Sequence, residues 1–339
     1  MAGLALQLAA SGCSTVGYIW QATKGQLMIV NRARPIPDVI KDERTPPRIK
    51  ELLGEIPQIK AFGEEYGLKP TSNYTEYVKI DRPYIVYVVS ASEKLAFKPR
   101  TWSFPIVGSF TYLGWFDEDG ARGLAKELAE EGWDVDLRGA SAFSTIGYFR
   151  DPVLSSMIPP GQEALGGLVN VVLHESVHAT LYVSGQSYFN ESLASFVADE
   201  ITPVYLGLKH GKDAPVTAEY LAKERDWEGR KQRFAQAYAE LDTLYRSAQT
   251  EGEKTAKKAE ILANLKQATG WSRDINNATL IQFRTYGVGM AEFGQLFKAC
   301  GKDWPRFWKK IATVQESTFP EKQMEQIGTV VLQLAQSGC

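Results

Sequence analysis

The chain has 339 residues, of which 44% are hydrophobic, and this is the composition of a globular protein with a sizeable core. Its formal net charge is −2, so no basic surplus points to a nucleic-acid partner. Cys13, Cys300 and Cys339 are too few and too scattered for a disulfide framework. Cys300 and Cys339 could pair or could both be free thiols, and the sequence leaves these alternatives open.

The N-terminus has the features of a lipid-anchored protein. A short apolar run ends in Ala10-Ser11-Gly12-Cys13, which resembles the lipobox of a bacterial lipoprotein signal. The resemblance implies that residues 1–12 are removed, that Cys13 carries a lipid, and that the protein is anchored to the membrane of the bacterial envelope and faces the periplasm. Two features depart from the pattern, because the run is short and no Lys or Arg precedes it. The alternative is an ordinary helix that ends at Gly12.

Residues 13–160 are expected to form a subdomain of helices and β-sheet. Helical spacing of apolar residues predicts a helix over 15–33 and a second that begins after Pro46-Pro47 and ends near Gly67. Runs rich in β-branched and aromatic residues predict strands over 84–90, 102–108 and 110–116. A helix over 118–131 and a short strand over 134–137 follow. Extended peptides commonly bind at the edge of such a sheet, where Pro105 would be suitable.

A motif for metal chemistry lies at residues 174–178, where His174 and His178 flank Glu175. The proline-free apolar run over 161–173 predicts a buried helix that carries this motif. Residues four apart lie on one helical face, about 6 Å apart along the axis, so both imidazoles can bind one ion. Such a site suits Zn²⁺, with Glu175 as the general base that activates a zinc-bound water. The alternative is a buried helix whose histidines are satisfied by hydrogen bonds.

A second carboxylate follows the motif closely. Residues 183–189 are expected to form a loop, and Asn190 can cap a helix that runs through Glu191. Two antiparallel helices joined this way would bring Glu191 back over the histidine face. The spacing resembles that of the gluzincin metallopeptidases, whose third ligand is a glutamate in an Asn-Glu-x-x-Ala element, matched here by Asn190, Glu191 and Ala194.

The resemblance extends over most of the chain. Residues 17–18, 25–27, 32–36, 101–108 and 144–154 resemble, together with the lipobox and the zinc motif, a family of bacterial lipoproteins described as putative aminopeptidases. It implies one Zn²⁺ per chain, held by His174, His178 and Glu191, and peptides as substrates.

Further site residues follow from the same resemblance. Tyr286 is the candidate that stabilises the oxyanion, the alternative being that it belongs to the core or the surface. Ser195 stands where gluzincins often carry an acidic residue, so Asp199 or Asn190 is expected to orient one histidine. The Gly-x-Met-Glu-Asn element that binds the substrate amine in related exopeptidases is absent.

Other residues near the motif are expected to bind the substrate in its place. Asp151 or Glu163 would replace the missing glutamate, and Tyr148 lies in the polar and aromatic segment that leads to the motif. Beyond the second helix, two charged helices over 217–247 and 253–269 could form a hairpin that shades the cleft.

These features predict an α+β, predominantly helical protein with the zincin-like metallopeptidase fold. A small, mostly antiparallel sheet is expected next to the active-site helix, and residues 161–339 are expected to form a helical zinc-binding subdomain, continuous with residues 13–160. The expected function is zinc-dependent hydrolysis of peptide bonds by an aminopeptidase. Two alternatives remain open, namely an endopeptidase or small-peptide hydrolase with the same site, and a non-catalytic envelope lipoprotein with structural zinc.

Overall fold

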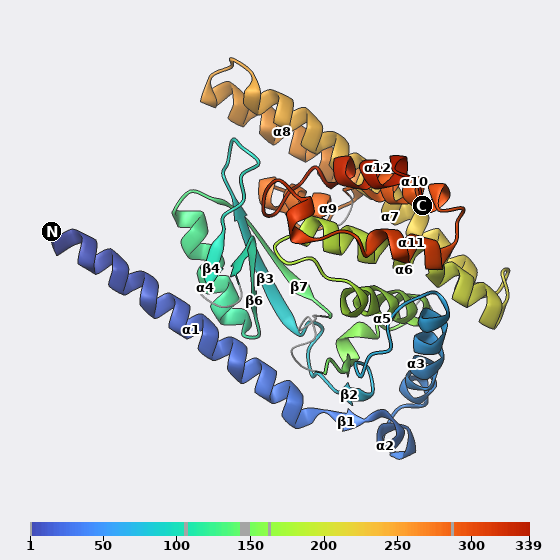
Figure 1. Ribbon diagram of the computed structural model, residues 1–339. Helices are drawn as coiled ribbons and strands as arrows, with labels where there is room; N and C mark the ends of the chain where they lie inside the picture. Colours follow the sequence, from blue (N-terminus) through green and yellow to red (C-terminus); the bar gives the residue numbers. More distant parts are fainter. Residues whose placement is uncertain (1, 105–107, 143–149, 162–163, 286–287) are drawn as a thin grey trace.

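The computed structural model describes residues 2–104, 108–142, 150–161, 164–285 and 288–339, and is predominantly helical with small sheets (Figure 1). The first part of the chain contains α1 (Ala2–Arg32), β1 (Arg34–Pro35), α2 (Ile36–Lys41), α3 (Pro47–Glu65), β2 (Glu76–Val78), β3 (Val86–Ser92), β4 (Trp102–Phe104), β5 (Gly108–Phe110), β6 (Tyr112–Trp115), α4 (Glu118–Glu130), β7 (Asp134–Ala140) and β8 (Val153–Leu154). The second part contains α5 (Ala164–Thr180), α6 (Ser187–His210), α7 (Pro215–Arg246), α8 (Glu251–Thr269), α9 (Asn277–Thr285), α10 (Met290–Ala299), α11 (Trp304–Ile311) and α12 (Ile327–Gln336).

Helix α1 lies along the outside of the molecule, with the N-terminus projecting from it (Figure 1). It is continuous from Ala2 to Arg32, so a helix that ends at Gly12 is wrong. The reason is that one glycine costs a helix only about 1 kcal/mol, which its many good helix formers outweigh. Gln21 ties α1 to β6, because its amide donates to the carbonyl of Gly114 at 3.2 Å and accepts from the N–H of Phe116 at 2.9 Å.

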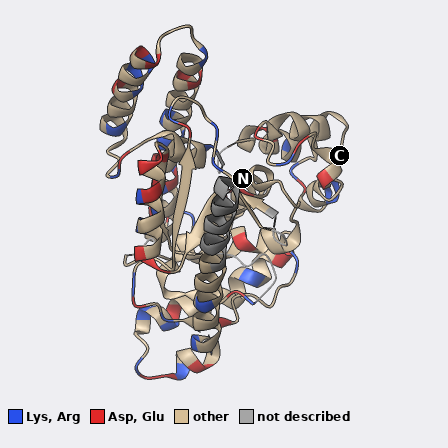
Figure 2. Ribbon diagram, turned by 90° about the vertical axis from the view of Figure 1, so that its left-hand side faces the viewer, with Lys and Arg blue, Asp and Glu red and all other residues tan. Residues whose placement is uncertain are grey.

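The outer face of α1 is apolar. Ile19, Trp20, Leu27 and Val30 are all exposed, Trp20 to 71%. At 100° per residue these four positions fall within a sector of about 100°, so they form one stripe, called here the α1 stripe. The sequence of α1 contains two charged residues, Lys24 and Arg32, and the coloured part of this helix is mostly tan in Figure 2. None of the described helices is both long and apolar enough to span a membrane.

The larger sheet has the strand order β6-β3-β7, and both pairings are antiparallel. Side chains alternate along β3, so that Val86 and Val88 join the main core while Tyr87 and Val89 pack with α4. Two smaller sheets, β1-β2-β8 and the hairpin β4-β5, complete the β structure that is described. The expected strand over 134–137 extends to Ala140 as β7, whereas Pro105 lies outside the described residues.

The main core combines residues from both ends of the chain, from Ile29 to Val331, and therefore crosses the boundary expected at residue 160. Helix α5 lies at its centre, packed between α3, α6 and α7 (Figure 1). Helices α7 and α8 form the expected hairpin, with a core of their own shared with α9. The turn between them ends at Thr250, whose side chain caps α8 with Glu253 in a reciprocal capping box, so that Gly252 lies inside the helix.

The end of the chain is joined to the α10–α11 region by a disulfide between Cys300 and Cys339, whose Cα atoms are 4.9 Å apart. Of the two alternatives that the sequence left open, the structure therefore contains the pair. Cys300 is fully buried at the end of α10. Closing a loop with a sequence separation of 39 residues stabilises a folded chain by about 3–4 kcal/mol through the entropy of the unfolded state.

Candidate active site

Two antiparallel helices, α5 and α6, present polar side chains to each other along a shared groove. On α5, Asn170, His174 and His178 follow one another at intervals of four residues, and therefore lie on one face. On α6, Glu191 and Asp199 lie eight residues apart on the face that meets them. Helix α6 begins at Ser187, so the expected cap at Asn190 is wrong, and Asn190 is a buried residue of the first turn.

At one end of the groove three side chains converge. The Nε2 atoms of His174 and His178 lie 3.3 and 3.7 Å from the same oxygen, Oε2 of Glu191. One ligand atom from each residue lies within 4.8 Å of the others, and among the described residues this is the group of His, Cys, Asp and Glu that could hold a metal ion. Ligand atoms about 2.1 Å from a tetrahedral ion are roughly 3.4 Å apart, so the arrangement fits such an ion.

The electrostatics of this group favour a charged Glu191. Burial disfavours its carboxylate, but hydrogen bonds from His174 and His178 outweigh this cost and hold the pKa of Glu191 well below its usual range. Burial also opposes the charged form of His178. The hydrogen bond to Glu191 and the negative charges around the ring are stronger, and raise the pKa of His178. Negative charge is therefore concentrated where the two rings meet, which suits a cation.

Glu175 lies beside this group but takes no part in it. Its Oε2 atom is buried and has no hydrogen-bond partner among the described residues. Burial is the main reason that the pKa of Glu175 is raised. The negative charges of Glu191 and Asp151 raise this pKa further, whereas the charges of His174 and His178 lower it. A buried carboxylate oxygen without a partner is costly for the fold, and such a group is well placed to accept a proton from a bound molecule.

A cavity of about 270 Å³ adjoins His174 on the side of α7 and α9. It is lined by Asn170, His174, Ser195, Asp199, Glu224, Trp227, Lys231, Gln282 and Phe283. Gly166 allows α7 to approach α5 here, because a Cβ at this position would lie 2.7 Å from the ring of Tyr220. The expected hairpin therefore does reach the site, since its first helix forms one wall of the cavity.

Helix α9 completes this wall. Its first residue, Asn277, is fully buried and donates from Nδ2 to the carbonyls of Glu93 and Lys94, at 2.9 and 3.2 Å. The hydroxyl of Tyr245 donates to Oδ1 of Asn277 at 2.7 Å, so one side chain joins α9 to the end of β3 and to α7. These bonds fix the helix that carries Gln282 and Phe283 into the cavity wall.

Comparison with known proteins identifies the family. Residues 17–326 match the protein family described as "Putative aminopeptidase". The chain belongs to this family. The match contains α5, α6, α7 and α9, so the whole groove and its cavity lie within it. Neither the curated proteins nor the solved structures contain a match to the chain.

In this member of the family, the loop between α5 and α6 sets where Glu191 points. Asn190 spans the loop, since its Oδ1 accepts from the N–H of Val183 at 2.9 Å and its Nδ2 donates to the Val183 carbonyl at 2.8 Å. The amide of Gln186 donates to the carbonyl of Glu321 at 2.7 Å and accepts from the N–H of Met324 at 3.2 Å. The loop is thus held both internally and by the C-terminal segment.

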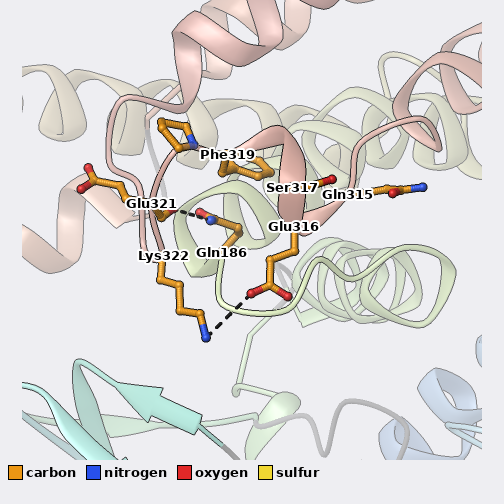
Figure 3. Close-up of a pocket in the computed structure, with 8 residues that line it drawn as sticks. Gln186, Gln315, Glu316, Ser317, Phe319, Glu321 and Lys322 are labelled. Carbon is orange, nitrogen blue, oxygen red and sulfur yellow. Dashed lines mark hydrogen bonds and ion pairs between the residues drawn. The ribbon is translucent and has the colours of Figure 1, made fainter.

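A second hollow, of about 560 Å³, lies where this segment meets the loop. Figure 3 shows Gln186 between the two backbones, with Glu316 and Lys322 pointing toward each other at the rim. Their charged atoms are 3.8 Å apart and largely exposed, so the pair contributes little to stability. This hollow contains neither histidine nor Glu175, and its contacts explain the position of α6 instead.

The structure describes some of the remaining site residues that the sequence predicted, but not all of them. Asp199 accepts a hydrogen bond from Nδ2 of Asn170 at 3.0 Å, and whether Asp199 or Asn190 orients a histidine stays a prediction. Asp151 is buried near Glu175, close enough for its charge to raise the pKa of Glu175. Tyr148, Glu163 and Tyr286 lie outside the described residues, as does the side chain of Cys13.

Tyr74 is a neighbour of Glu175 that sequence analysis missed. Its φ of 61° lies in the left-handed region, which is unfavourable for a bulky residue. Two hydrogen bonds stabilise this strained backbone conformation. The N–H of Tyr74 donates to the carbonyl of Asp151 at 2.7 Å, and the ammonium of Lys60 donates to the carbonyl of Asn73 at 2.7 Å. Burial, with the charges of Glu175 and Asp151, raises the pKa of Tyr74 well above its usual value, so it keeps its proton beside Glu175.

Asn170 could have been found from the sequence, because it continues the spacing of His174 and His178 by one turn. Asp199, which sequence analysis named, lies eight residues beyond Glu191 on α6. By contrast, no pattern in the sequence marks Tyr74, Glu224 or Phe283, because their positions depend on how distant segments pack.

Proposed function

We propose that the protein is a zinc-dependent aminopeptidase in which His174, His178 and Glu191 hold the ion. The observation that carries the proposal is the convergence of these three ligand atoms within 4.8 Å, beside a glutamate that is not one of them. Two imidazoles and one carboxylate are a common ligand set of catalytic zinc. A purely structural site would have no use for a second acidic group such as Glu175, which is not a ligand.

The roles of the side chains follow from their positions. When bound, Zn²⁺ would polarise the scissile carbonyl and lower the pKa of a water molecule. Glu175 removes a proton from the attacking water, and its burial favours the protonated form that can then deliver the proton to the leaving amine. Tyr74 keeps its hydroxyl hydrogen and stabilises negative charge next to Glu175.

The proposal is tested by digesting a mixed peptide library with the purified protein and reading the products by mass spectrometry. Peptides should lose residues from the N-terminus, because an aminopeptidase removes them there. A chelator should abolish the reaction, and Zn²⁺ added in slight excess should restore it. Internal cleavage would indicate an endopeptidase instead, and tightly bound zinc without any cleavage would favour a structural site.

We also propose that α1 lies against a membrane, with a lipid on Cys13. The support is the α1 stripe, an exposed apolar face close to Cys13 along the helix. Contiguous exposed apolar surface usually marks a contact with a partner or a membrane, and one lipid chain needs such a second signal for stable anchoring. Cys13→Ser should move the protein from the membrane fraction of bacterial cells to the soluble fraction. Unchanged fractionation, together with an unmodified Cys13 in mass spectra of the wild type, would refute lipid anchoring.

A further inference from the structure

The cavity next to His174 combines a negative end with an apolar wall. Its negative end contains Asp199 from α6 and Glu224 from α7, and its apolar wall contains Trp227 and Phe283, whose ring centres are 5.3 Å apart. At about 270 Å³ the cavity is smaller than most sites for complete small molecules, and corresponds to about nine water molecules. It can therefore take one amino-acid residue but not several.

The charges in the cavity are not balanced. Lys231 is the cation of its lining; it pairs with Glu228 at 2.8 Å, and its charge offsets the raised pKa values of Asp199 and Glu224 only in part. Burial, and then the charge of Asp199, raises the pKa of Glu224, while burial is also the main cause of the raised pKa of Asp199. Asn170 holds Asp199 in place, since its Nδ2 donates both to Oδ1 of Asp199 at 3.0 Å and to the hydroxyl of Tyr220 at 3.1 Å. A positively charged group of a ligand would offset the negative charges of Asp199 and Glu224.

The position of the negative end agrees with the chemistry of an N-terminal residue. Asn170 lies one helical turn before His174, about 6 Å along the axis of α5. In a peptide, the N-terminal nitrogen is two bonds from the carbonyl carbon that is attacked, about 2.5 Å away. Adding the C=O bond of about 1.2 Å, one ionic hydrogen bond of about 2.8 Å and a carbonyl oxygen about 2.1 Å from the ion gives a reach of roughly 9 Å at most. The offset of about 6 Å between Asn170, which holds Asp199, and His174 is shorter than this reach.

We propose that this cavity binds the first residue of the substrate, with Asp199 and Glu224 pairing with its free ammonium group and Trp227 and Phe283 contacting its side chain. The inference rests on the proposed function and specifies its substrate as peptides with an unblocked N-terminus and an apolar first residue. Asp151, which sequence analysis favoured for this role, is buried beside Glu175 and is not part of the cavity lining.

The first test compares leucine 4-nitroanilide with its N-acetylated and N-succinylated forms, using the zinc-loaded protein. The free amine should be cleaved with a kcat/KM about 10- to 100-fold higher than the acetylated form, as expected for a charge-assisted hydrogen bond in a cavity. Asp199→Asn and Glu224→Gln should each reduce this preference, mainly through KM, and should improve cleavage of the negatively charged succinylated form. Glu240→Gln, an exposed substitution on α7 outside the cavity, is the matched control and should keep the preference.

The second test is independent of turnover. Binding of leucinamide and N-acetyl-leucinamide to the zinc-loaded Glu175→Gln variant is measured by calorimetry, and leucinamide should bind at least about 10-fold more tightly. Equal binding of the two amides overturns the inference. Equal cleavage of free and acetylated substrates by an active enzyme also overturns it, but leaves the proposed function intact. Preferential binding of leucinamide without any cleavage by the wild type would support the amine site and contradict the peptidase function.

Discussion

Replacing Glu175 with Gln should abolish peptide cleavage while the bound metal stays in place. Gln has the shape of Glu but cannot take a proton from water at neutral pH. Since general-base catalysis contributes about 10²- to 10⁴-fold, kcat should fall by at least 100-fold. Metal content should not change, because Glu175 is not among the three residues whose ligand atoms converge. The test measures the cleavage rate and the zinc content of both proteins, the zinc content by elemental mass spectrometry.

The loss should not come from unfolding. The Oε2 atom of Glu175 is buried without a hydrogen-bond partner among the described residues, so a neutral side chain of the same size is tolerated there. Glu200→Gln makes the same chemical change on the exposed face of α6 and serves as the control for the substitution itself. Full activity of Glu175→Gln with normal metal content would contradict the role of Glu175 as the base.

Replacing Glu191 with Ala should remove the metal. The carboxylate is the only negatively charged member of the three-residue group, and both Nε2 atoms face its Oε2 at 3.3 and 3.7 Å. Loss of an outer partner of a metal ligand typically costs 10- to 100-fold in affinity, so loss of a ligand itself should cost more than about 100-fold. The affinity is measured by competition with a chelating dye, and cleavage should fall together with zinc occupancy.

Two comparisons separate metal loss from a change in the fold. Glu191→Gln keeps the volume of the side chain but lacks its charge, and should also bind zinc poorly. Circular dichroism of Glu191→Ala should match that of the wild type in the presence of a chelator, because both then lack the metal. Stoichiometric zinc in Glu191→Ala would show that the ion is held elsewhere.

Local sequence patterns predicted several helices and strands of the fold. Helices from after Pro47 to about Gly67 and over 118–131, and strands over 84–90 and 134–137, were expected from apolar spacing and β-branched runs. They are present as α3, α4, β3 and β7, with slightly different bounds. These patterns depend on residues that are close together in the sequence, so they can be recognised without knowledge of the fold. The starts of α6 and α8 were placed too late, because contacts of Ser187 with the C-terminal segment and a capping box at Thr250 extend them.

The continuity of α1 shows a different limit. A cysteine after small residues is read as the end of a leader, yet the backbone of Ala2–Arg32 is one helix. Helix formation depends on the summed propensities of the run, and a recognition motif for processing contributes nothing to that sum. Motif and conformation therefore carry separate information at this end of the chain.

What the sequence by itself determined is that His174 and His178 share one helical face, because residues four apart do so by helix geometry alone. Glu191 meets them because the loop between α5 and α6, which the C-terminal segment holds, brings α6 back along α5. Only the tertiary structure decided what surrounds them, namely the cavity with Asp199 and Glu224, the strained Tyr74 beside Glu175, and the disulfide of Cys300 with Cys339. These features join residues tens to hundreds of positions apart, and their contacts depend on how α3, α6, α7 and α9 pack together, which no local pattern encodes.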